Sequence, residues 1–164
     1  MPKEKSFGIS CHILYLRNFN QTKKMDYKKL DEDLNTIVEK RIALSKISYA
    51  DEAYDDIEEE MHDLEDNFNE NYGDELEDIL EKIYAQLKSD NEVLLPSAYL
   101  ANEYHVMVPD AYGKVTYEVI GREGVPLESE QFDKMDVRLV LVPNPARFVL
   151  QINGKSMKDL WVAR

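Results

Sequence analysis

The chain has 164 residues, of which 43% are hydrophobic and 32% are charged, and its 33 acidic and 20 basic residues give a formal charge of -13. This composition excludes a collagen-like, low-complexity or membrane-spanning chain, and it argues against a nucleic-acid-binding protein that works through a basic surface. A chain of this length buries enough surface to fold without a disulfide or a metal, so we expect a single domain over residues 1–164.

Residues 1–22 are predicted to form a strand and a loop. Phe7 to Leu16 is rich in β-forming residues and apolar on both sides toward its end, which is typical of a central strand. The N-terminus lacks the apolar run of a secretory signal, and the single cysteine, Cys11, has no partner for an internal disulfide. We therefore expect a cytoplasmic protein in which Cys11 is a buried thiol.

Residues 23–92 are predicted to form three amphipathic helices. The first begins at Asp26, a favourable N-cap, and continues to about Ser48. Ser48 is the expected N-cap of the second helix, which ends before a turn at residues 69–73 (NENYG). The third begins at Asp74, which with Glu77 resembles a capping box, and it ends near residue 89.

Residues 93–164 are predicted to form a β-rich part. Five short segments have the β-branched, turn-bounded character of strands: 104–108, 115–120, 137–142, 147–152 and 155–162. Asn153-Gly154 predicts a tight hairpin turn, and residues 121–126, which contain two glycines and a proline, are expected to be a loop. The predicted fold class is α+β: an N-terminal strand, three helices, then an antiparallel β-meander of four to five strands packed on the helices.

The charge is concentrated in one segment. Residues 51–92 hold eighteen acidic and two basic residues, a charge of -16, whereas residues 1–50 carry +4 and residues 93–164 carry -1. A surface of one sign attracts a partner of the opposite sign and repels nucleic acid. We therefore expect a non-enzymatic binding or assembly protein that docks a basic protein on residues 51–78, with neither nucleic acid nor membrane as a direct partner. The candidate partner-binding residues are Asp55, Glu59, His62, Asp66, Asp78 and Glu81.

The simplest alternative is that this acidic face only keeps the protein soluble. A second alternative is chemical. Glu60-x-x-Asp63 and Glu75-x-x-Asp78 resemble the paired acidic motifs of all-α nucleoside-triphosphate pyrophosphohydrolases. In that family, carboxylates from neighbouring helices bind Mg²⁺, which holds a polyphosphate. The resemblance implies a Mg²⁺-dependent nucleotide phosphohydrolase with these four residues as metal ligands.

A third alternative is a self-assembling structural subunit, such as a homodimer formed through the helices. No phosphate-binding loop, dinucleotide fingerprint or nucleophile elbow is present in the sequence, so we expect neither a cofactor nor a catalytic triad.

Overall fold

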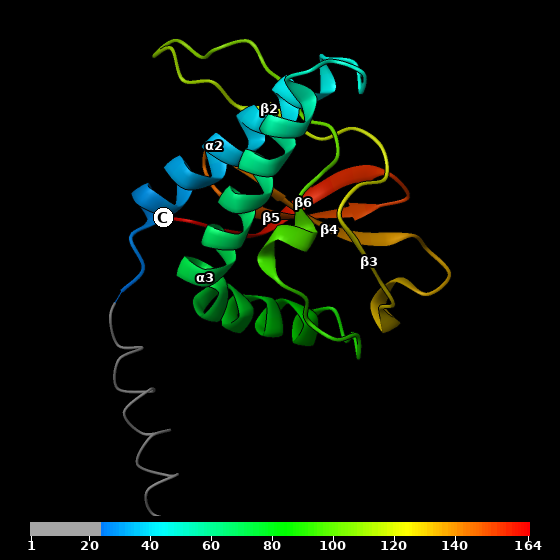
Figure 1. The fold of residues 1–164 in the computed structure, drawn as a ribbon. Helices are drawn as coiled ribbons and strands as arrows, with labels where there is room; N and C mark the ends of the chain where they lie inside the picture. The colour runs from blue at the N-terminus through cyan, green and yellow to red at the C-terminus, as the bar shows by residue number, and fades with distance from the viewer. Residues whose placement is uncertain (1–23) are drawn as a thin grey trace, which may run out of the picture.

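The computed structural model of the protein describes residues 24–164 (Figure 1). The predicted strand at residues 7–16, including Cys11, lies outside this range. The first described helix is α2, Tyr27–Ser45, and its predicted N-cap is confirmed: the Asp26 carboxylate accepts hydrogen bonds from the backbone N–H groups of Lys28 and Lys29, both at 3.1 Å. The helix buries Leu30, Leu34, Ile37 and Val38.

The prediction of two further helices separated by a turn is wrong. One continuous helix, α3, runs from Tyr54 to Gln86, so it begins after the predicted cap at Ser48 and passes through residues 69–73. Figure 1 shows that its C-terminal part runs at an angle to its N-terminal part.

Tertiary contacts explain why the chain stays helical where its local sequence favours a turn. Tyr72 continues the buried stripe from Phe68 to Leu76 in steps of four, and its hydroxyl donates to the Asp33 carboxylate at 2.6 Å. Asn69 also makes tertiary contacts, because its side chain forms two hydrogen bonds with Ser97. These contacts outweigh the weak helix propensity of the segment.

The main sheet is antiparallel, in the order β3-β4-β5-β6. Three strands have the predicted bounds: β4 is Val137–Val142, β5 is Arg147–Ile152 and β6 is Lys155–Val162. The fourth, β3 at Val125–Leu127, occupies a segment that was predicted to be a loop. The strand tolerates its proline because β3 lies at the edge of the sheet.

The remaining two strands are β1 at His105–Val106 and β2 at Tyr117–Glu118, and within residues 24–164 they pair only with each other. They were predicted within the meander, but they form a separate two-stranded sheet. Two short 3-10 helices are present: η1 at Pro96–Tyr99 follows α3 and precedes the strands, and η2 at Glu130–Phe132 lies between β3 and β4.

One core joins the helices to the sheet. The α2 helix packs on α3, and η1 lies between α3 and β4. Within this core the Tyr84 and Tyr99 hydroxyls are hydrogen-bonded at 2.5 Å, and the ring of Tyr99 meets that of Phe148 edge-on. The α+β class is therefore confirmed. Neither α2 nor α3 combines the length and apolarity that a membrane span requires.

Candidate protein-docking surface

Helix α3 carries the net charge of the whole protein. It contains fourteen acidic residues and one lysine, a charge of -13. The chain has 33 acidic and 20 basic residues in all, so nineteen of each lie outside α3 and cancel. The acidity is thus a property of one element and not of the molecular surface in general.

Eight of these acidic residues form one row along α3, which we call the acidic row. They recur at intervals of three or four positions, which places them on the same side of an α-helix. All eight are exposed, and from first to last they cover 26 residue steps, or about 39 Å of helix axis. The members are Asp55, Glu59, Asp63, Asp66, Glu70, Asp74, Glu77 and Glu81.

The basic residues of α2 reach α3 beside the acidic row. Lys40 pairs with Glu60 at 2.6 Å, and Arg41 pairs with Glu65 at 2.7 Å. The Arg41 guanidinium also donates to the carbonyl of Ala101 at 3.0 Å, so this largely buried pair holds α2, α3 and the following segment together. Leaving Asp74 aside, no salt bridge connects a member of the row to a basic residue within 24–164.

The structure places the six predicted partner-binding residues on the exposed surface of α3. Four of them belong to the acidic row, while Asp78 and His62 lie on its flanks. The exposed His62 ring lies 3.7 Å from the Glu65 carboxylate.

The sequence reasoning missed the other half of the row: Asp63, Glu70, Asp74 and Glu77. The sequence contained the necessary signal, because the spacing of three and four between acidic residues continues through residues 69–73. It was not followed because a turn was expected there.

The four residues of the metal-site alternative are not brought together. They lie on one helix instead of two neighbouring ones, and Glu60 and Glu75 are fifteen residues, or about 22 Å of helix axis, apart. Glu60 is also paired with Lys40. Within residues 24–164, no group of three or more His, Cys, Asp or Glu side chains is close enough to hold a metal ion.

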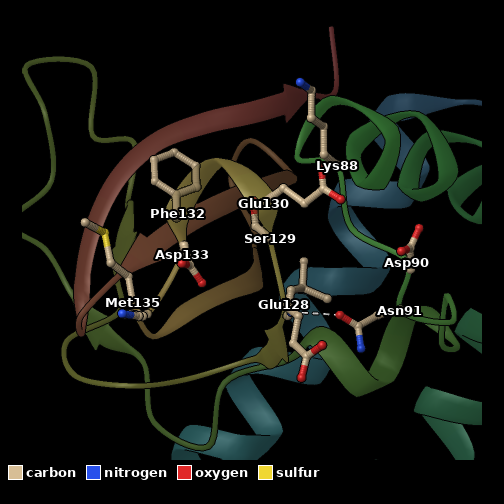
Figure 2. Close-up of a pocket in the computed structure, with 11 residues that line it drawn as sticks. Lys88, Asp90, Asn91, Glu128, Ser129, Glu130, Phe132, Asp133 and Met135 are labelled. Atoms are coloured by element: carbon tan, nitrogen blue, oxygen red, sulfur yellow. Dashed lines mark hydrogen bonds between the residues drawn. The ribbon is translucent and has the colours of Figure 1, made fainter.

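Two hollows lie at the C-terminal end of the acidic row, and we call them together the groove. Glu77, Glu81 and Glu92 line one of about 420 Å³, and Asn91 lines both this hollow and a larger one of about 620 Å³. Figure 2 shows the larger hollow between the end of α3 and the β3–η2 segment. It is lined by Lys88, Asp90, Asn91, Leu127, Glu128, Ser129, Glu130, Phe132, Asp133, Lys134 and Met135.

Hydrogen bonds between its two walls shape this groove. The last carbonyls of α3 lack partners within the helix, and the β3–η2 segment supplies them: Gln131 donates to Gln86, and the Ser129 hydroxyl donates to Leu87. The backbone N–H of Glu128 donates to the Asn91 side chain at 2.7 Å, as drawn in Figure 2. These hydrogen bonds fix the two walls of the groove relative to each other.

No protein-family model, curated protein or solved structure matches this chain. The candidate function accordingly depends on the geometry and charge of the acidic row and groove.

Proposed function

We propose that the protein is a non-enzymatic binding or assembly protein of the cytoplasm, and that it docks a basic protein partner along α3. The observation that carries this proposal is that one helix holds the full -13 charge of the chain and exposes eight of its carboxylates in a single row. A chain that needed acidity only for solubility would gain as much from carboxylates spread over its surface.

Repulsion between neighbouring carboxylates of the acidic row destabilises α3, and a binding role explains why the charges are nevertheless placed together. Like charges three or four positions apart on a helix destabilise it by about 0.2–0.5 kcal/mol per pair. Seven such steps connect the members of the acidic row. A cationic partner would relieve this repulsion on binding, and the field of the row would accelerate encounter with that partner.

The groove gives the partner a place to extend beyond the row. Seven acidic residues and two lysines line its two hollows, so the same positive chain could continue from Glu81 past Asn91. The exposed apolar side chain of Met135, at the far end, would add an uncharged contact.

The test compares two variants that change the charge equally. Glu59→Lys with Asp66→Lys reverses two positions of the row that are seven residues apart. Glu32→Lys with Glu39→Lys does the same on the exposed surface of α2. Proteins captured from native lysate by the wild type and by each variant are identified by mass spectrometry at low salt and at about 0.5 M salt, where surface electrostatics are strongly screened.

We expect the wild type and the α2 variant to capture the same basic protein, and the row variant and high salt to lose it. If the two variants capture identical sets of proteins, the acidic row is not the docking surface.

A further inference from the structure

Strand β6 is an open edge of the main sheet. In the order β3-β4-β5-β6 it pairs with β5 on one side, and no strand of residues 24–164 pairs with its other side. Residues 155–159 are all exposed, and Met157 is 57% exposed. An edge of this kind presents a row of unpaired N–H and C=O groups to which a further strand can bind.

The opposite edge of the sheet, β3, is much less suited to accept a strand. It has three residues, and the central one, Pro126, has no N–H to donate. Strand β6 has eight residues. Within the part of the chain that the structure describes, β6 is therefore the edge of the main sheet whose length suits a strand of ordinary size.

The sequence predicts a strand of matching length shortly before the described residues. This segment, residues 7–16, has ten residues, of which seven are of hydrophobic types and none is Asp, Glu, Lys or Arg. Leaving so much apolar surface in water is unfavourable, so the segment is expected to pack on the domain.

The described chain begins beside β6. Tyr27, the first residue of α2, packs its ring edge-on against that of Trp161, near the C-terminal end of β6, with the ring centroids 6.1 Å apart. Lys24 is three residues before Tyr27, and Figure 1 shows the start of α2 next to the C-terminus. The chain therefore enters the domain at one end of the open edge.

Length and apolarity both favour a segment that runs parallel to β6. Eight residue steps separate Leu16 from Lys24, and they span at most about 26–29 Å. Strand β6 is itself about 23 Å long, so an antiparallel segment would need almost the whole connector to run back along it. A parallel segment ends close to Trp161. Its most apolar part, residues 13–16, then lies beside the half-buried end of β6.

We propose that residues 7–16 pair with the outer side of β6, in the parallel direction, and form a fifth strand that closes this edge of the sheet. The segment lies outside the described residues, and the open edge, the point where the chain enters and the sequence pattern together support its position. In this position it also prevents β6 from pairing with other protein chains, which an open edge permits. The pairing is independent of docking on the acidic row.

The alternative is an edge that stays open and is protected by its own sequence. Lys155, Lys158 and two register shifts between β5 and β6 are features that discourage strand addition. The two cases differ in where residues 7–16 lie relative to β6. Cys11, the single cysteine of the chain, can report this position.

A second cysteine gives Cys11 one partner in the full-length chain. In a parallel pair, Cys11 is near the middle of the segment and lies beside Lys158, near the middle of β6. Arg164 is the matched control, because it is also exposed but is six residues, or about 20 Å, closer to the point where the chain enters. A short bis-maleimide is added to dilute Lys158→Cys and Arg164→Cys proteins, and the linked peptides are identified by mass spectrometry.

We expect Lys158→Cys to be linked to Cys11 within one chain at least about tenfold faster than Arg164→Cys, since pairing holds the two thiols together more closely than a flexible tether does. A segment that is tethered but not paired would react at position 164 at least as fast. Equal rates, a faster reaction of Arg164→Cys, or links only between two chains overturn the proposal.

The direction of the segment is tested by moving the thiol to its start, with Cys11→Ser and Ser6→Cys. A parallel segment then places the thiol near Lys155→Cys, whereas an antiparallel segment places it near Arg164→Cys. Faster linking at position 155 supports the parallel direction, and faster linking at position 164 overturns it.

Hydrogen exchange measures the backbone hydrogen bonds of the same pair. Amides of residues 7–16 should exchange at least about tenfold more slowly than in an unfolded peptide, and Ile13→Pro should accelerate exchange both there and in β6. Gln21→Pro, in the connector, should leave both unchanged, and exchange in α3 checks that each variant remains folded. Exchange of residues 7–16 at the rate of an unfolded peptide, or an effect of Ile13→Pro that does not reach β6, overturns the pairing.

Discussion

Helix α3 and the sheet β3–β6 differ in what they contribute to the core and to the charged surface of the molecule. The central strands bury both of their faces: Val140 and Leu141, neighbours on β4, are 0% and 1% exposed. Helix α3 buries one stripe and exposes the acidic row on another side. The sheet thus contributes mainly core, whereas α3 contributes core on one side and the net negative charge of the protein on the other. Changes in the sheet should therefore alter stability, and changes on the outer side of α3 should alter recognition.

The largest effect is expected at Gly124, where β3 meets β4. Its φ is +79°, and a Cβ there would lie 1.9 Å from the carbonyl oxygen of Leu139. Gly124→Ala must therefore displace β3 or β4 and should lower the free energy of unfolding by about 3 kcal/mol or more. Denaturant unfolding measures this. Gly113→Ala is the matched control, since φ is +78° but no atom lies within 4 Å of its Cβ.

The control isolates the steric clash from the backbone strain. Gly113→Ala should cost only about 1–2 kcal/mol, the cost of a left-handed conformation. If the two substitutions lower the free energy of unfolding equally, the close approach of Leu139 is not the reason why position 124 requires glycine.

The next effect concerns the contact between α2 and α3. The Glu65 carboxylate is 12% exposed and pairs with Arg41, whose side chain is 18% exposed. Glu65→Gln leaves a buried guanidinium without its counter-charge, so we expect a loss of about 2–3 kcal/mol. Glu60→Gln removes the partner of Lys40, a more exposed pair, and should cost less than about 1 kcal/mol. Similar losses in thermal unfolding would contradict this distinction between inner and outer carboxylates.

A smaller effect of opposite sign is expected at Gly73, in the segment predicted as a turn. The residue lies inside α3, its φ is not positive, and a Cβ would meet no atom within 4 Å. Gly73→Ala should therefore stabilise the protein by about 0.5–1 kcal/mol, through a better helix propensity and a less flexible unfolded chain. A loss of stability would mean that the change in direction of α3 requires glycine at this position.

These glycines also show how far the sequence predicts the fold. The bounds of β4, β5 and β6 follow from short β-branched segments and the Asn153-Gly154 turn, because these signals are local. The continuity of α3 is not local, since it depends on Tyr72 reaching Asp33 and Asn69 reaching Ser97. β3 was missed for a similar reason: only its pairing with β4 makes a strand of a segment with glycine and proline.

The candidate docking surface was predictable in part. The local charge count located it on residues 51–92, and helical periodicity identified Asp55, Glu59, Asp66 and Glu81. The row as a whole, and the groove at its end, required the actual length of α3 and the position of the β3–η2 segment.

The smallest expected effect is that of Mg²⁺, which tests whether α3 has a chemical role in addition to its charge. The carboxylates of Glu60, Asp63, Glu75 and Asp78 are spread along one helix, so they cannot hold one ion as a shared site. Mg²⁺ should therefore act only by screening, and whatever shift in Tm it produces should be the same in Asp78→Asn and in Asp66→Asn, a row position outside the metal motif. Adding a nucleoside triphosphate should not change this equality. A Mg²⁺-dependent gain in Tm that Asp78→Asn alone removes would restore the phosphohydrolase hypothesis, because screening does not distinguish between two exposed carboxylates of the same helix.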